Sequence, residues 1–320
     1  MAQATKVSQS IGDSSLSAQT YEVLGDVYYH MRDWPQAERS YRQALFALVE
    51  SRHQAATIRG RLKMKIGHCH YDSLSFGGAL QQYREAYEDV RSSGAGRALA
   101  VQALRNLGNT NCRLGLFGEA VEFYEESRRL AILLSDVSSQ AHAELGLSYA
   151  LRNRGEPTQA LEAAERAEDL YRHGHDSLGI VMAQHNKAVA AIDLNLLSEA
   201  ETWLDAAASH YHNHDDDELE AAVLEEKARL WQIKGATDEA IKAAATGLRL
   251  LEGRPRSTMY FRLMTLLGLF EIQEQPASTQ AFRRLREAAQ GFVELSEAHE
   301  LAQLIGRLLN LIASKEVGPV

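Results

Sequence analysis

Two polar side chains, Arg105 and Asn109, stand four residues apart in a segment of strong helical periodicity and therefore share one helix face. A guanidinium group can hold a carboxylate through two parallel hydrogen bonds, and a side-chain amide can pair with the main chain of a peptide. Asn106 and Arg113 lie nearby, so basic and amide groups cluster in a chain whose formal net charge is −9. This combination suits peptide binding; the alternative is a solvated helix surface without a ligand.

A second candidate for chemistry is the run of histidine and aspartate between His210 and Asp217. Both residue types bind divalent metals, but a metal site needs convergent geometry and supporting hydrogen bonds. The run falls between two predicted helices, where loops are polar and aspartate caps helices. We therefore favour an incidental surface loop and predict no metal. His68 and His70 flank Cys69, but such close neighbours diverge on a helix.

Motifs of catalytic sites are missing from the sequence, which contains neither GxSxG nor HExxH. Cys112 has no identifiable base beside it, which favours a packing role over a nucleophilic one. We therefore expect no enzymatic activity and predict no cofactor.

Composition restricts the class of protein further. Ala, Leu, Glu, Gln and Arg dominate and only 5 Pro occur, which favours helix. The net charge of −9 repels phosphates, so nucleic-acid binding would need a concentrated basic patch. The polar N-terminal region does not resemble a signal peptide, and no apolar stretch approaches the roughly 20 residues that span a bilayer. A cytoplasmic protein without membrane contact is expected.

Six alanines recur at spacings of 42, 41, 40, 40 and 40 residues: Ala37, Ala79, Ala120, Ala160, Ala200 and Ala240. Twelve residues before each stands a small residue: Gly25, Gly67, Gly108, Ser148, Ala188 and Ala228. Four residues after each stands Tyr41, Tyr83, Tyr124, Ala164, Leu204 or Ala244. Small residues let two antiparallel helices approach closely, and the residue one turn later fills the gap against the next pair. Helix ends are predicted at Arg32-Asp33, Gly115, Gly155, Asn195 and Gly235.

Segments 24–45 (LGDVYYHMRDWPQAERSYRQAL) and 107–127 (LGNTNCRLGLFGEAVEFYEES) resemble tetratricopeptide repeats. The period near 40 is similar to long-helix variants in bacterial peptide-sensing regulators, kinesin light chains and cell-polarity adaptors. The resemblance implies an all-α, right-handed superhelical solenoid of about seven antiparallel helix pairs, capped by a C-terminal helix over Ala298–Ala313. We expect a disordered tail over residues 1–17 and a single repeat domain over residues 18–315, because only a neighbouring pair can cover each apolar face.

In this family the first helices of the pairs line a concave groove that holds a peptide. The resemblance therefore implies a set of peptide-binding residues: Arg61, Lys65, His68, Arg105, Asn106, Asn109, Arg113, Tyr149, Arg152, His185 and Asn186. Arg105 with Asn109 is similar to the basic-plus-amide arrangement with which several members hold a C-terminal carboxylate. The full set of those members is not matched here position by position.

The expected function is that of an interaction module for a peptide or protein partner, either a bacterial peptide-responsive regulator or an adaptor. One alternative is an enzyme that acts on a partner protein, such as a phosphatase-like protein, which would require a catalytic constellation. Another alternative is a helical-repeat nucleic-acid binder, which the negative charge opposes. The sequence leaves the partner's identity and the oligomeric state open.

Overall fold

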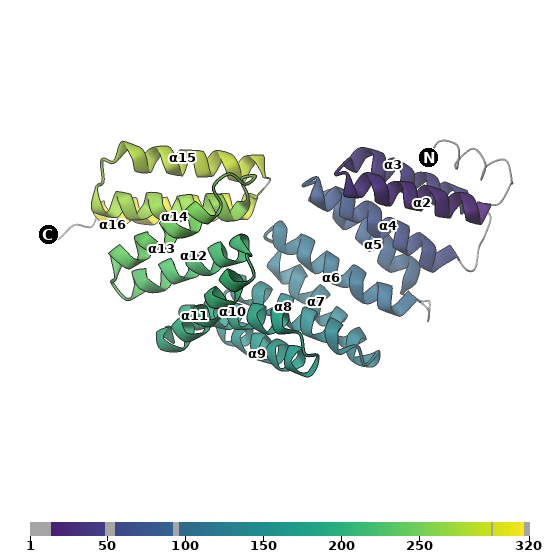
Figure 1. The fold of residues 1–320 in the computed structure, drawn as a ribbon, viewed down its shortest axis with the longest axis horizontal. Coiled ribbons are helices and arrows are strands. Elements are labelled where there is room, and N and C mark those ends of the chain that lie inside the picture. The colour runs from purple at the N-terminus through teal and green to yellow at the C-terminus, as the bar shows by residue number, and fades with distance from the viewer. Residues whose placement is uncertain (1–13, 49–54, 92–95, 296, 317–320) are drawn as a thin grey trace. The chain divides into compact units, whose positions relative to one another are not determined.

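The computed structural model of the protein describes residues 14–48, 55–91, 96–295 and 297–316 (Figure 1). Over these ranges the chain forms helices joined by short turns and contains no strand, which confirms the all-α fold. The chain divides into two compact units, unit 1 (Met1–Ala150) and unit 2 (Leu151–Val320). The single domain over 18–315 stays a prediction. Of the expected tail, residues 1–13 lie outside the described residues, and residues 14–17 belong to the first described helix.

Unit 1 is built from helices that pack in sequential pairs. They are α2 (Ser14–His30), α3 (Trp34–Ala47), α4 (Ala55–Asp72), α5 (Phe76–Val90), α6 (Arg97–Arg113), α7 (Phe117–Leu133) and most of α8 (Val137–Asn153). Helix α2 packs on α3, α4 on α5 and α6 on α7, and the short turns make the partners antiparallel (Figure 1). Helix α3 also packs on α4, and α5 on α6, as expected for repeats that cover one another.

The packing position of each pair in unit 1 holds a glycine on the first helix and a tyrosine ring on the second. A Cβ atom at Gly67 would lie 2.4 Å from the ring of Tyr83, and one at Gly108 would lie 2.7 Å from the ring of Tyr124. Glycine is therefore required for the ring to fit, which confirms that these glycines stand where the two helices approach closely. The ring fills the gap within its own pair, whereas we predicted contact with the next pair; Tyr124 makes both contacts, because it also covers Gly146 on α8.

The turn inside each of the first six pairs, from α2–α3 to α12–α13, contains a residue in the left-handed conformation, as the sequence predicted for five of the six. After this residue the chain closes a hydrogen bond onto the last helical turn, as from Leu116 N to Asn111 O at 2.9 Å. The left-handed residues are Arg32 (φ 59°), Leu74 (62°), Gly115 (73°), Gly155 (88°), Asn195 (61°) and Gly235 (76°). Leu74 is the position that sequence patterns missed, because leucine rarely adopts this conformation.

Unit 2 is built from α9 (Pro157–His173), α10 (Ser177–Asp193), α11 (Leu197–Asn213), α12 (Asp217–Ile233), α13 (Thr237–Leu250), α14 (Thr258–Glu274), α15 (Thr279–Glu294) and α16 (Ala298–Glu316). Each of these helices packs on the next one along the chain, from α9 to α16. The largest fully buried side chains include Leu204, Tyr211, Leu230, Phe270 and Phe292. The predicted capping helix corresponds to α16, which packs on α14 and α15 and buries Leu304.

Two pairs of unit 2, α10–α11 and α12–α13, carry alanine at the packing position where unit 1 has glycine, whereas α14 keeps a glycine, Gly268, against Leu285. Ala188 and Ala228 are fully buried, and Leu204 and Ala244 occupy the place of the tyrosine. The residue before the packing position is leucine or isoleucine in the pairs of unit 1 and lysine in these two pairs of unit 2. Lys187 lies 2.9 Å from a carboxylate oxygen of Glu168 and 4.4 Å above the ring of Trp203. Aromatic rings and a carboxylate thus stabilise a cation at a position that otherwise calls for an apolar side chain.

Candidate functional site

The face that α4 and α6 share in unit 1 carries most of the predicted peptide-binding residues. Arg61, Lys65 and His68 lie on α4, and Arg105, Asn106, Asn109 and Arg113 lie on α6. Their side chains fall into two groups: those already paired within the protein, and those that keep hydrogen-bonding capacity for a ligand.

Arg61 and Lys65 are already paired with acidic residues of α2. Arg61 Nε and Nη2 donate to the two oxygens of Glu22, each at 3.0 Å. Lys65 Nζ donates to both oxygens of Asp26, at 2.7 and 2.8 Å, and lies 2.8 Å from Glu22. Burial would raise the pKa of Glu22, but the hydrogen bonds from Lys65 and Arg61 outweigh it and lower the pKa. These two cations therefore add little free positive charge to the face.

His68 and Asn106 form a neutral polar pair next to them. Asn106 Nδ2 lies 3.0 Å from His68 Nε2, and the imidazole packs on the ring of Tyr83 at 5.7 Å between centroids. Burial lowers the pKa of His68, and the positive charges of Arg105 and Lys65 lower it further, against the opposing effect of Asp72. A neutral imidazole can accept the hydrogen bond from the Asn106 amide.

Arg105 is half-buried on α6, and it makes no hydrogen bond or ion pair with any residue that the structure describes. One turn later, Asn109 is exposed, and its Oδ1 accepts a hydrogen bond from the hydroxyl of Tyr124 at 2.6 Å. This bond fixes the amide, so the Nδ2 group is the side with hydrogen-bond donors to offer. A basic group and an oriented amide donor therefore share one face.

The two remaining unit 1 candidates contact aromatic rings. The guanidinium of Arg113 lies 5.5 Å from the ring centroid of Phe76, within the range of a cation–π contact. The ring of Tyr149, on α8, lies edge-on to Phe117 at 6.4 Å and is 40 % exposed. Tyr149 can therefore offer an exposed aromatic surface, whereas Arg113 is held by Phe76.

In unit 2 one predicted residue, Arg152, belongs to a network of ion pairs. Arg152 Nε donates to Asp193 Oδ2 at 2.7 Å, and the other oxygen of Asp193 lies 3.0 Å from Arg229 Nη2. Arg229 also pairs with the buried Glu226 at 2.5 Å. Burial alone would raise the pKa of Glu226, but the charges of Arg229, Arg152 and Arg262 outweigh it and lower the pKa to about 2. Arg152 thus contributes to a structural network.

His185 and Asn186 lie half-buried on α10 in the same unit. Burial lowers the pKa of His185, and Arg262 and Arg152 lower it further, while Glu226 opposes them. His185 is accordingly neutral at physiological pH, and it stands among charged groups that pair with one another. The assignment of both residues to a peptide site stays a prediction.

The histidine-rich run has the geometry of a helix end followed by a cap. His210 and His214 stack with ring centroids 4.2 Å apart, and burial together with the charge of His214 lowers the pKa of His210. Asp215 adopts a φ of 54°, and Asp216 Oδ1 accepts from Leu219 N at 3.1 Å, which caps α12. Among the described residues, no group of three or more His, Cys, Asp or Glu side chains could hold a metal ion.

The two cysteines are buried and have weakly acidic thiols. Burial raises the pKa of Cys69 and that of Cys112 to about 12 in each case. The sulfur of Cys112 lies 3.8 Å from the hydroxyl of Tyr124, which places this residue in the core under Asn109. A thiol with so high a pKa is not a reactive nucleophile, which supports the packing role.

Comparison with known proteins agrees with this architecture. A tetratricopeptide-repeat family model matches residues 20–55. The apo form of RapI aligns with 91 % of this chain and 99 % of its own, with a TM-score of 0.70 and 12 % identity. Aspartyl phosphate phosphatase F from Bacillus subtilis covers 92 % and 75 % respectively, with a TM-score of 0.71 and 11 % identity. The chain has the tetratricopeptide-repeat fold.

NprR, solved in complex with its cognate peptide NprX, shares this fold at a TM-score of 0.66 and 13 % identity, over 90 % of this chain and 82 % of NprR. No sequence among the curated proteins matches the chain. None of the helices over the described ranges has the length and apolar character needed to cross a membrane.

The sequence analysis did not identify the acidic residues that pair with Arg61 and Lys65. Glu22 precedes Arg61 by 39 residues, and Asp26 precedes Lys65 by the same number, close to one repeat period. Successive first helices are neighbours, so an acid and a base about one repeat period apart, here offset by one helical turn from equivalent positions, can pair. This spacing indicates candidate pairs but does not separate Arg105 from the paired cations, because Glu144 stands 39 residues after Arg105 and is bonded to Arg128 at 3.1 Å instead.

Proposed function

We propose that the protein is a peptide-binding module, and that the face of α4 and α6 in unit 1 binds an acidic group of the peptide. The observation that carries this proposal is the state of Arg105, a half-buried cation with no ion pair among the described residues. The neighbouring cations Arg61, Lys65 and Arg113 are held by Glu22, Asp26 and Phe76. A ligand carboxylate would therefore find its partner at Arg105.

The amide of Asn109 supports the same proposal from another direction. Its oxygen is occupied by Tyr124, so its donors can bind a peptide carbonyl or a carboxylate beside Arg105. Charge-assisted bonds from a guanidinium are stronger than neutral ones and favour planar carboxylates. Together the two side chains would fix both the position and the direction of a peptide end.

Solved structures of similar fold that contain a bound peptide also support the proposal of a peptide-binding module. NprR shares the fold and is seen with a peptide, and a Rap conjugation gene regulator is seen with the Phr* peptide at a TM-score of 0.62 and 16 % identity. A peptide-responsive regulator and an adaptor are both compatible with such a module. The name of one structural neighbour, an aspartyl phosphate phosphatase, favours the alternative of a phosphatase-like enzyme. Burial raises the pKa of Cys69 and of Cys112 to about 12, so neither thiol offers a reactive nucleophile for such an enzyme.

Selection of peptides with free C-termini on the wild-type protein tests the proposal. Peptides should be enriched, and Arg105→Ala should weaken their binding by about tenfold to a hundredfold, the worth of a charge-assisted hydrogen bond. Amidation of the peptide should cost a similar factor. Combining the amidated peptide with Arg105→Ala should cost little more than either change alone, because both remove one interaction.

Arg61→Ala is the matched control, since it removes a cation from the same face that Glu22 already neutralises. Its effect on peptide affinity should be under about threefold, because a paired, exposed cation contributes little. Equal losses in Arg61→Ala and Arg105→Ala would argue for a diffuse electrostatic effect. Failure to enrich any peptide, or enriched peptides that ignore Arg105→Ala, would refute the proposed site.

A further inference from the structure

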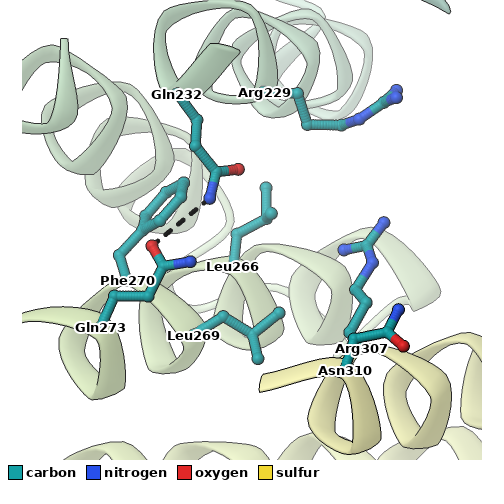
Figure 2. A pocket seen from close by; sticks show the side chains of 8 residues that line it. All are labelled: Arg229, Gln232, Leu266, Leu269, Phe270, Gln273, Arg307 and Asn310. Atoms are coloured by element: carbon teal, nitrogen blue, oxygen red, sulfur yellow. Dashed lines mark hydrogen bonds between the residues drawn. The ribbon is translucent and has the colours of Figure 1, made fainter. Parts of the chain in front are cut away.

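Unit 2 contains a pocket of about 460 Å³ between α12, α14 and α16 (Figure 2). Its floor is apolar, formed by the buried side chains of Leu266, Leu269 and Phe270. A volume of this size falls within the range of small-ligand sites, roughly 300–1,000 Å³. The pocket does not include the face of α4 and α6, so it raises a separate question of function.

The polar groups of the pocket lie on its two sides. Figure 2 shows Gln232 and Gln273 together, joined by a hydrogen bond from Nε2 to Oε1 of 3.4 Å, and the guanidinium groups of Arg229 and Arg307 apart from them. Both glutamines are exposed and mark the mouth, whereas both arginines are half-buried. A ligand in this pocket would meet an apolar floor, amides at the mouth and positive charge at one side.

Arg307 differs from the other arginines around it. Arg229 is held by Glu226 and Asp193, and Arg262 is held by Glu225 through two hydrogen-bond contacts of 3.1 and 2.9 Å. Arg307 makes no ion pair or hydrogen bond with any residue in the described ranges. Burial lowers the pKa of Arg307, and the nearby charges of Arg229 and Arg262 add to this, against Glu225 and Glu300.

The carboxylates of this region are all engaged with other arginines. Asp193 pairs with Arg152 and Arg229, Glu226 with Arg229, and Glu225 with Arg262. Glu300 lies 3.8 Å from Arg262 as well. A half-buried guanidinium without a carboxylate is costly, and an incoming anion would offset that cost.

We propose that this pocket binds a carboxylate carried on an apolar group, with Arg307 holding the carboxylate and Leu266, Leu269 and Phe270 contacting the apolar part. The unpaired guanidinium of Arg307 can hold one planar carboxylate through two parallel hydrogen bonds, and the apolar floor suits the organic part that such a carboxylate carries. The carboxylate can come from the C-terminus of a peptide with an apolar last residue or from a small organic acid. The chemistry at Arg307 is the same in both cases.

Leucine-methyl NMR of the full chain provides the test, with 4-phenylbutyrate and the peptide acetyl-Ala-Ala-Phe as probes. The amide form of each probe serves as a comparison, and so does inorganic phosphate. At least one acid should produce saturable shifts at the methyls of Leu266 and Leu269, and its amide should bind about tenfold more weakly or worse. Saturation by 4-phenylbutyrate assigns the pocket to small acids, and saturation by the peptide alone assigns it to peptide ends.

Arg307→Gln should lower the affinity of the active probe by about tenfold or more. Arg286→Gln, which removes an exposed arginine of α15, should leave it unchanged. Asn310→Trp gives a second variant at an exposed position of the pocket wall; it should block binding without lowering the melting temperature. Arg105→Ala should not alter these shifts, so this site and the α4–α6 face can fail independently.

Absence of saturable shifts at Leu266 and Leu269 with both acids would overturn the proposal. Equal affinity for an acid and its amide would do the same, because it would remove the role of the carboxylate. Tighter binding of inorganic phosphate than of either acid would show that the apolar floor contributes nothing. If Arg307→Gln does not fold, Asn310→Trp decides between a blocked pocket and binding elsewhere.

Discussion

The two units differ in how polar side chains near the packing positions find hydrogen-bond or ion-pair partners. In unit 1 a tyrosine of the second helix covers the packing glycine, and in two of the three pairs its hydroxyl donates to the residue that follows the glycine. Tyr41 donates to Asp26 at 2.8 Å and Tyr124 to Asn109 at 2.6 Å, in both cases across 15 residues of sequence. In unit 2 small aliphatic side chains replace the tyrosine, as in the pair Ala188 and Leu204, and charged residues pair with one another below the surface.

This difference separates side chains that keep hydrogen-bonding capacity at the surface from side chains whose capacity is used inside the protein. A side chain tethered by a tyrosine hydroxyl keeps its remaining donors at the surface, so it can meet a ligand at little further entropic cost. A side chain in a buried ion pair has its capacity used internally, and its loss mainly affects folding. Asn109 belongs to the first kind, and Glu226 and Arg229 to the second.

The largest effect should come from removing one partner of the unit 2 network. Glu226 is 4 % exposed and pairs with Arg229, so Glu226→Ala leaves a half-buried guanidinium with less compensation. We expect a loss of about 3–5 kcal/mol in the free energy of unfolding, the usual cost of breaking a buried pair. Urea denaturation followed by circular dichroism measures it.

Glu88→Ala in unit 1 is the control, because Glu88 pairs with Arg91 at 2.8 Å on an exposed surface. Its cost should stay below about 1 kcal/mol. Similar losses for Glu226→Ala and Glu88→Ala would remove the distinction between the two units.

A smaller effect should follow from giving unit 1 the packing of unit 2. Gly67→Ala places a methyl group against the ring of Tyr83 and should destabilise the protein by about 1–3 kcal/mol through overpacking. The double variant Gly67→Ala/Tyr83→Leu reproduces the Ala188 and Leu204 pair of unit 2, which has the same separation of 16 residues. The two costs should be non-additive, the double variant recovering about 1 kcal/mol or more of their sum. Additive losses in chemical denaturation would show that the two packing solutions are not interchangeable.

Most of the fold could be predicted from the sequence because its signals are local and periodic. The spacing of Ala37, Ala79 and Ala120 fixed the helix pairs, and Gly115 and Gly155 fixed the turns between their helices. Leu74 escaped prediction because a tight turn held by its neighbours can force a leucine into the left-handed conformation. The ring of Tyr41 or Tyr83 packs within its own pair, a detail that periodicity alone does not resolve.

The candidate site was less predictable, because pairing decides which charges remain available. Sequence reasoning grouped Arg61, Lys65 and Arg152 with Arg105 as groove cations, but their carboxylate partners lie 39 to 41 residues away. A helix pattern shows which residues share a face, and only the packed structure shows which of them neutralise each other. The network around Glu226 was missed for the same reason, although two adjacent acids at buried positions of α12 gave a hint.

The hydrogen bond from Tyr124 that orients Asn109 can be removed without changing Asn109 itself. Tyr124→Phe deletes the hydroxyl and should cost about 0.5–1.5 kcal/mol of stability, the net worth of one hydrogen bond. Peptide binding at Arg105 should weaken several-fold, because Asn109 would then have to be ordered on binding. Tyr41→Phe is the matched control: its hydroxyl serves Asp26, which Lys65 also holds, so stability should change similarly and peptide affinity should not. Calorimetry with a selected peptide and thermal melts separate the two effects, and an unchanged affinity in Tyr124→Phe would refute the tether.

The smallest expected effect concerns a turn in unit 1 where arginine occupies a glycine position. Arg32 is exposed and has a φ of 59°, whereas the equivalent residues Gly115, Gly155 and Gly235 adopt this conformation without strain. Arg32→Gly should stabilise the protein by roughly 0.5–1 kcal/mol, since relief of about 1–2 kcal/mol of backbone strain exceeds the entropy lost by a more flexible unfolded chain. Arg39→Gly, at an exposed position inside α3, removes the same side chain without relieving strain and should destabilise by about 1 kcal/mol. A melting temperature that falls in both variants would mean that the turn of the first repeat holds Arg32 through contacts that outweigh the strain.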